Sequence, residues 1–281
     1  MFGWFGFTGV SGGVQPALEV IHRRTAQAGN RRPLLFVHGA YAGAWCWDEH
    51  FMPFLAELGH DCHALSLRGH GESGGRESVH AHSLADYVND LRRIVETLPV
   101  EPVLVGHSMG GMVIQKYLED HAAAAAILMA PVPPSGLGGS VFRLMTGDPM
   151  LFGQISLFNL GGKELADMNT AARAVFSAGL DSARLQRYAE RMQTESQRAL
   201  FDMTFGALPQ RWRMNVPPML VMGADDDALF SPEMMQSTAE AYRADLVMIP
   251  DMAHAMMLEP HWRRAADLLA SWLEAQPAAR A

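Results

Sequence analysis

Short apolar runs alternate with amphipathic stretches along most of the chain. After a short opening segment near 18–22, the apolar runs lie at 33–39, 62–67, 102–105, 125–129, 218–222 and 245–250. Runs of this length and character are typical of strands that are buried on both faces. Stretches with helical spacing lie between or after them, at 50–58, 84–98, 112–119, 232–242 and 261–274. The alternation predicts an α/β fold, with a mostly parallel, doubly wound sheet between two layers of helices.

One long interval breaks this alternation. From Pro133 to Arg213 the chain has helix-like patches but no strand-like run, and clusters of proline and glycine mark both ends of the interval. We therefore expect a core formed by 18–132 and 214–281, with a helical insertion at 133–213. An insertion between strands lies at the rim of the sheet, where ligands bind.

The insertion is rich in phenylalanine and methionine. These residues are Phe142, Phe152, Phe158, Phe176, Phe201 and Phe205, with Met145, Met150, Met168, Met192 and Met203. Methionine is flexible and polarisable, so the set suits an adaptable apolar pocket. Packing of the insertion onto the sheet explains most of the set equally well.

The first 17 residues form an apolar, glycine-rich tail. The tail lacks the basic start and the cleavage pattern of a signal peptide, and it is too short to span a bilayer. We expect either a poorly ordered tail or a flap in which Phe2, Trp4, Phe5 and Phe7 cover an apolar surface.

Composition and charge narrow the classes of function. The formal net charge is -8 and no block of like charges occurs, which argues against a nucleic-acid partner and favours a small neutral substrate. The only two cysteines, Cys46 and Cys62, indicate neither a disulfide framework nor a cysteine zinc site. We expect a cytoplasmic protein without an integral membrane segment, and homo-oligomerisation is left open.

The pattern Gly-x-Ser-x-Gly occurs around Ser11, Ser73 and Ser108, and its surroundings separate the three. Only Ser108 has a buried strand directly before it and a helix directly after it. At such a corner the backbone is strained, and glycines at 106 and 110 remove side chains that would collide. The hydroxyl then stands at the amino end of a helix, where negative charge is favoured.

A serine nucleophile needs a base, and the base needs an acid to hold it. Asp225, Asp226 and Asp227 follow one apolar run, and His254 follows the next. Because the carboxyl ends of parallel strands meet at one edge of a sheet, these side chains are expected near Ser108. His261 is a weaker candidate base because it opens the last helix, and His80 and His82 lack a ligand cluster that would indicate a metal.

Several segments together resemble the alpha/beta-hydrolase superfamily, in its esterase, lipase and lysophospholipase-like branch. They are "LFVHGAYAGAWCW", "LSLRGHGES", "VLVGHSMGG", "VMGADDDALFSP" and "DMAHAMMLEP", in this order. The resemblance covers 18–132 and 217–276, and it implies that the insertion is the cap.

The resemblance also assigns site residues. The triad implied is Ser108, Asp226 and His254, because the acid of this family usually falls three residues after the glycine that ends its strand. Asp227 is the reserve choice. The oxyanion donors implied are the N–H groups of Met109 and Ala40, while His38 and Gly39 are expected to shape the second donor's loop, and Trp45 and Trp47 to anchor the core.

The function expected is hydrolysis of a small-molecule carboxylic ester through an acyl-enzyme, on small to medium apolar substrates and without cofactor or metal. Two other classes stay open. The same constellation supports C–C bond hydrolysis, perhydrolysis, lactone opening and hydroxynitrile cleavage, and "HGAYAGAWCW" resembles the plant methylesterase and hydroxynitrile lyase loop. A non-catalytic receptor with this fold would normally have a broken triad, whereas here no member is missing.

Overall fold

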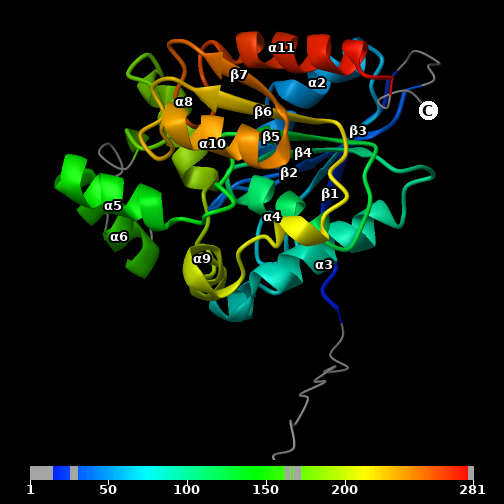
Figure 1. Cartoon of the computed structure of the whole chain (residues 1–281). Helices are drawn as coiled ribbons and strands as arrows, with labels where there is room; N and C mark the ends of the chain where they lie inside the picture. The colour runs from blue at the N-terminus through cyan, green and yellow to red at the C-terminus, as the bar shows by residue number, and fades with distance from the viewer. Residues whose placement is uncertain (1–14, 26–30, 162–164, 166, 168–171, 278–281) are drawn as a thin grey trace, which may run out of the picture.

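A seven-stranded sheet forms the centre of the protein (Figure 1). The computed structural model describes residues 15–25, 31–161, 165, 167 and 172–277. The strands are β1 (Val20–Arg23), β2 (Leu34–Val37), β3 (Cys62–Leu65), β4 (Val103–His107), β5 (Ala125–Met129), β6 (Met219–Ala224) and β7 (Asp245–Ile249). They lie in the order β1-β3-β2-β4-β5-β6-β7, and only β1 is antiparallel to its neighbour. This confirms the predicted mostly parallel sheet, and the opening segment near 18–22 becomes its antiparallel edge.

Helices cover both faces of the sheet. They are α1 (Trp45–Asp48), α2 (Phe51–Glu57), α3 (Leu84–Val95), α4 (Met109–Tyr117), α10 (Pro232–Tyr242) and α11 (Trp262–Ala275), with a 3-10 turn η1 (Arg76–Ala81). Alternate residues of β2 point to opposite faces of the sheet. Leu34 and Phe36 pack with α1, α2 and α11, whereas Leu35 and Val37 pack with α3, α4 and α10. The central strands β2, β4, β5 and β6 are therefore buried on both faces, which explains their apolar sequences.

The insertion contains only helices and turns among its described residues. They are α5 (Gly138–Gly147), α6 (Pro149–Gly161), α8 (Ser182–Arg191) and α9 (Gln197–Phe201), with the turns η3 (Asp202–Gly206) and η4 (Arg211–Arg213). Figure 1 shows α5 and α6 at one side of the sheet. α8 packs Tyr188 into the core on the α11 face, and α9 packs Ala199 into the core on the α4 face.

The helix predictions were accurate in place and less so at their ends. α10 has the bounds expected, whereas α4 begins at Met109, three residues before the predicted start, because its first turn contains Gly110 and Gly111. The four-residue helix α1 was not expected. Of the helices in the described part of the chain, none combines the length and apolar character that a membrane span requires.

Glycines allow the strand-to-helix corner between β4 and α4 to pack closely. A Cβ atom on Gly110 would lie 2.3 Å from the Val37 carbonyl oxygen, and one on Gly106 would lie 2.6 Å from the Gly110 carbonyl oxygen. Both neighbours are buried backbone oxygens, one of β2 and one of α4, so they cannot move aside cheaply. Glycine at these positions is therefore a packing requirement of the corner.

Gly110→Ala is expected to lower the free energy of unfolding by about 1–3 kcal/mol, the usual cost of overpacking. Gly153, in α6, is the matched control, because a Cβ atom there meets nothing within 4 Å. Gly153→Ala should be neutral or should raise stability by roughly 0.5–1 kcal/mol, since alanine is the better helix former. Urea unfolding measures both variants, and a Gly110→Ala protein as stable as the wild type would contradict this packing argument.

Candidate active site

The corner between β4 and α4 holds Ser108 in an unusual backbone conformation. Its φ is 52° and its ψ is -115°, a region that residues with a side chain rarely adopt. The Ser108 N–H donates to the Met129 carbonyl at 3.0 Å, and the Ser108 carbonyl accepts from the N–H groups of Gly111 at 3.0 Å and Val132 at 3.1 Å. Hydrogen bonds with the next strand, the helix and the segment just before the insertion therefore hold the serine at the corner.

His254 and Asp227 form a buried pair at the same edge of the sheet. His254 lies in the loop after β7, and its Nδ1 donates to Asp227 Oδ2 at 2.7 Å. The other carboxylate oxygen, Oδ1, accepts from the N–H groups of Leu229 at 2.7 Å and Phe230 at 3.0 Å. Because Nδ1 carries the proton toward the carboxylate, Nε2 of the neutral imidazole is left as an acceptor.

The structure corrects the predicted acid: Asp227, and not Asp226, contacts His254. β6 runs one residue past Gly223 and ends at Ala224, which pairs with Ile249 of β7. The third residue after the strand is therefore Asp227. Asp225 and Asp226 lie in the following turn with exposed side chains, and their N–H groups bond to the carbonyls of Ile249 and Met252.

Ser108 and His254 line one cavity of about 110 Å³. No hydrogen bond joins these two described residues, and such bonds are often long before substrate binds. His107 donates from Nε2 to the His254 carbonyl oxygen at 2.9 Å, which fixes the backbone of the histidine loop. Burial, together with the nearby imidazole of His254, lowers the pKa of His107 well below its ordinary value, so His107 stays neutral.

Of the two expected oxyanion donors, Ala40 lines this cavity and Met109 directly follows Ser108, which also lines it. Met109 is the first residue of α4, and its N–H therefore has no partner within the helix. Ala40 lines the cavity, and its N–H donates to none of the described residues. A Cβ atom on Gly39 would lie 2.7 Å from His107 Nδ1 and 3.1 Å from Ser108 Cβ, so only glycine lets the Ala40 loop approach the serine this closely.

An apolar extension leads from the catalytic cavity into the insertion. A second cavity, of about 80 Å³, shares Tyr41, Phe176 and Met192 with the first and is otherwise lined by aliphatic and aromatic side chains. Of the predicted phenylalanines and methionines, Phe158, Phe176 and Met192 line this space. Phe142, Phe201, Phe205, Met145 and Met150 are exposed, Met203 is buried in the core, and Met168 lies outside the described residues.

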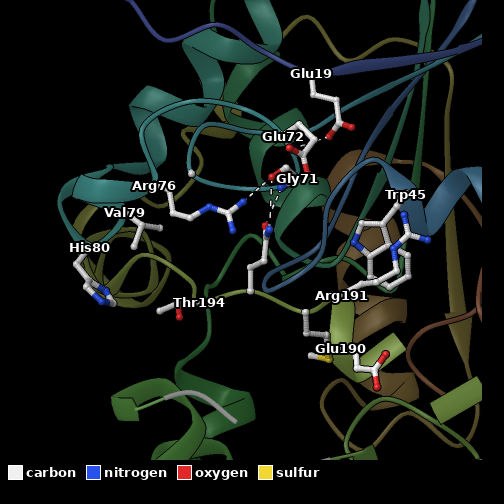
Figure 2. Close-up of a pocket in the computed structure, with 13 residues that line it drawn as sticks. Glu19, Trp45, Gly71, Glu72, Arg76, Val79, His80, Glu190, Arg191 and Thr194 are labelled. Carbon is white, nitrogen blue, oxygen red and sulfur yellow. Dashed lines mark hydrogen bonds between the residues drawn. The ribbon is translucent and has the colours of Figure 1, made fainter. Parts of the chain in front are cut away.

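A polar cavity that the sequence did not indicate has a volume of about 520 Å³. Figure 2 shows the side chains that line it. The labelled charged side chains around it are Glu19, Glu72, Arg76, Glu190 and Arg191. Trp45 and Met192 line both this cavity and the catalytic one. They form the partition between the two spaces.

Other candidates from the sequence have structural contacts. Ser73 is buried, donates to the Ser66 carbonyl at 2.6 Å and accepts from the Glu19 N–H at 2.8 Å, whereas Ser11 lies outside the described residues. His82 donates to the Gly75 carbonyl, His80 is exposed in η1, and His261 precedes α11. Trp47 is fully buried, and Cys46 and Cys62 are buried free thiols.

One group in the described part of the chain has the ligand types of a metal site. His22, Asp61 and His63 place their ligand atoms within 4.8 Å of one another, at the start of β3 and on β1. This is the amino end of β3, whereas Ser108 lies beyond the carboxyl end of the parallel strand β4. The cluster is therefore separate from the candidate active site.

Comparisons with known proteins agree with the fold described above. The model of the Alpha/beta hydrolase family matches residues 34–268. The chain is 24% identical to a monoacylglycerol lipase of Mycolicibacterium smegmatis over 95% of each chain. It is 36% identical to a non-heme haloperoxidase of Rhodococcus erythropolis over 38% of this chain, a match that spans 39% of that protein. A thermophilic esterase from Thermogutta terrifontis superposes with a TM-score of 0.71 at 19% identity, covering 92% of this chain and 93% of that one.

The buried His38 should make stability depend on pH. Burial, with the nearby charge of His70, lowers the pKa of His38 from 6.5 to about 3, and its Nε2 accepts from the Leu67 N–H. Unfolding below pH 6.5 therefore takes up a proton that the folded protein excludes, so the free energy of unfolding falls as the pH falls toward 3. His38→Gln should reduce the slope of unfolding free energy against pH by up to about 1.4 kcal/mol per unit between pH 4 and 6. Urea unfolding at several pH values measures this slope. A slope equal to that of the wild type would contradict the lowered pKa of His38.

Proposed function

The chain belongs to the alpha/beta hydrolase family, and from this premise we propose that it is a serine hydrolase that cleaves carboxylic esters. The observation that carries the proposal is the 2.7 Å hydrogen bond between His254 and Asp227, beside a cavity that His254 shares with the corner residue Ser108. The lipase and esterase names of the relatives support the same reaction class.

The proposed mechanism assigns one role to each group. The Ser108 hydroxyl attacks the ester carbonyl carbon while Nε2 of His254 takes its proton. Asp227 holds the imidazole by its Nδ1–H and stabilises the imidazolium that forms. The N–H groups of Met109 and Ala40 stabilise the negative oxygen of the tetrahedral intermediate, and each such donor is typically worth about 3 kcal/mol.

The same groups complete the reaction. The imidazolium gives its proton to the leaving alcohol, which ends the acylation half, and the acyl group stays on Ser108 as an ester. Water, deprotonated by His254, then attacks the acyl carbon, and the serine leaves with the proton that returns from the imidazolium. The products are a carboxylic acid, an alcohol and the unchanged enzyme.

The walls of the cavity support an apolar substrate group. Phe158, Phe176 and Met192 from the insertion surround the extension of the catalytic cavity. We propose that an acyl chain occupies this space and that the insertion, 133–213, is a cap over the core of 18–132 and 214–281. Since the extension adds only about 80 Å³, short to medium chains fit better than long ones.

A second candidate reaction shares every step up to the acyl-enzyme. Hydrogen peroxide in place of water would attack the acyl carbon and release a peracid. The 36% identity to a protein named non-heme haloperoxidase, over 38% of this chain, favours this alternative over the other chemistries that the fold supports.

Ser108→Ala should abolish cleavage of p-nitrophenyl esters. Loss of the nucleophile is expected to reduce kcat by at least about 10³-fold, because only the oxyanion donors and substrate binding remain. Labelling by a fluorophosphonate probe should disappear with it. Ser73→Ala is the matched control, since that serine occurs in the same short pattern but bonds to the backbone. A Ser108→Ala protein within tenfold of wild-type activity would rule the proposal out.

Asp227→Asn and Asp226→Asn separate the two neighbouring carboxylates. An amide at position 227 can still contact the imidazole but favours the wrong tautomer, so kcat should fall by about 10³–10⁴-fold. Asp226 is exposed, and its change should leave kcat within about threefold. Equal losses in the two variants, or a larger loss for Asp226→Asn, would contradict the assignment of Asp227.

A further inference from the structure

Glu195 is a buried carboxylate that the proposed reaction does not use. It lies in the insertion between α8 and α9, with an exposed fraction of 1%, and its Oε2 is 3.1 Å from Nε2 of the fully buried His70. Taking two charged groups out of water costs several kcal/mol for each ion, and the cost is recovered only when further hydrogen bonds satisfy them. The partners of this pair therefore indicate what it holds in place.

Each member of the pair favours the charged form of the other. Burial alone would raise the pKa of Glu195, but the charge of His70 and hydrogen bonds from Tyr87 and the Ser196 N–H outweigh it, so the pKa is lowered. Burial alone would lower the pKa of His70, but the Glu195 carboxylate outweighs it, so the pKa is raised. The imidazole and the carboxylate therefore stabilise each other in this buried contact.

One partner of Glu195 is the residue next to a proposed oxyanion donor. Glu195 Oε2 accepts from the Tyr41 N–H at 3.4 Å, and the Gln193 N–H donates to the Tyr41 carbonyl at 2.9 Å. Tyr41 has a φ of 66°, which is strained for a residue with a side chain. Its hydroxyl donates to Asn159 Oδ1, also in the insertion. The insertion therefore bonds Tyr41 at its N–H, its carbonyl and its side chain, directly beside Ala40.

The other partners join this contact to the core. Tyr87, from α3, donates its hydroxyl to Glu195 Oε1 at 2.7 Å. The Gly71 N–H donates to Gln193 Oε1 at 2.7 Å, and Gln193 Nε2 donates back to the Gly71 carbonyl at 3.4 Å. Figure 2 shows hydrogen bonds that meet at Gly71, including one from Arg76. The segment 193–195 thus connects the loop of His70 and Gly71 with the loop of Ala40 and Tyr41.

We propose that Glu195 is a positioning residue: with His70 behind it, its carboxylate holds the strained Tyr41 backbone, and so places the Ala40 N–H at the oxyanion position. The part that concerns catalysis rests on the proposed function, whereas the part that concerns loop order does not. The ester substrate does not touch Glu195 in this scheme. Its effect should appear in the rate of the chemical step and not in substrate binding.

Glu195→Gln is the sharpest variant, because it keeps the size of the side chain and an oxygen for Tyr87. In place of Oε2, which accepts, it puts an amide nitrogen, which donates. The Tyr41 N–H and His70 then face a donor where they faced an acceptor. Since losing one oxyanion donor costs about 10²–10³-fold in kcat, a displaced donor should cost at least about tenfold. KM should stay within about threefold, because binding of the acyl chain is unchanged.

A readout that needs no activity tests the loop directly. Hydrogen exchange followed by mass spectrometry on the full-length protein should show exchange in 38–42 faster by about tenfold or more in Glu195→Gln, because a loosened loop opens more often. Tyr87→Phe is the matched control: it removes one hydrogen bond to Oε1 but leaves the oxygen that faces Tyr41. It should leave kcat within about twofold and exchange in 38–42 unchanged.

If Glu195→Gln does not fold, Gln193→Ala tests whether the segment 193–195 orders the loop of Ala40 and Tyr41. Gln193 is only half-buried, and its side chain bonds Gly71. This variant too should speed exchange in 38–42 and lower kcat with little change in KM. Unchanged exchange together with unchanged kcat in the folded variant would overturn the positioning role. Equal effects of Glu195→Gln and Tyr87→Phe would overturn it as well, because that pattern indicates a general loss of stability. Activity that survives Ser108→Ala would reject the ester-hydrolase proposal but not the role of Glu195 in loop order, because hydrogen exchange tests that role without any activity.

Discussion

The backbone of Ser108 stands at φ and ψ values that cost a residue with a side chain on the order of 1–3 kcal/mol, and the structure around it keeps it there. Its N–H is bonded to β5, and its carbonyl accepts hydrogen bonds from α4 and from Val132, just before the insertion. Gly106 lets β4 approach α4, and Gly110 lets α4 approach the end of β2, at distances that no side chain would permit. Every other part of the candidate site is arranged around this fixed corner.

The insertion contributes to the site through bonds to the three loops that surround the corner. Arg143, in α5, donates to the Asp227 carbonyl at 3.0 Å, and the Val175 carbonyl accepts from the N–H of Ala255, the residue after His254, at 2.8 Å. Gln193 and Glu195 bond the backbone of Tyr41, beside the proposed donor Ala40. The insertion thus lines the apolar cavity and also connects the loops that contain Asp227, His254 and Ala40. A change in the insertion can therefore alter turnover without touching the substrate.

Much of this arrangement could be predicted from the sequence, because it depends on local patterns. Buried strands of a parallel sheet are apolar throughout, and a strand that passes directly into a helix through glycines indicates the corner of Ser108. The carboxylate that contacts His254 was predicted one residue too early because the end of β6 is set by its pairing with β7, where Ala224 lies opposite Ile249. Such pairing is a tertiary property that the local sequence does not contain. The same is true of Glu195, whose polar neighbours in "MQTESQ" give no sign that the carboxylate is buried against His70.

A crystal structure of the protein after reaction with a fluorophosphonate ester tests the central claim most directly, because the phosphonyl group imitates the tetrahedral intermediate. We expect a covalent bond from phosphorus to Ser108 Oγ, with the phosphonyl oxygen about 2.7–3.1 Å from the backbone nitrogens of both Met109 and Ala40. His254 should remain bonded to Asp227 through Nδ1, with Nε2 turned toward the serine oxygen. A label on another residue would contradict Ser108 as the nucleophile. A phosphonyl oxygen directed away from these two nitrogens would contradict Met109 and Ala40 as the oxyanion donors.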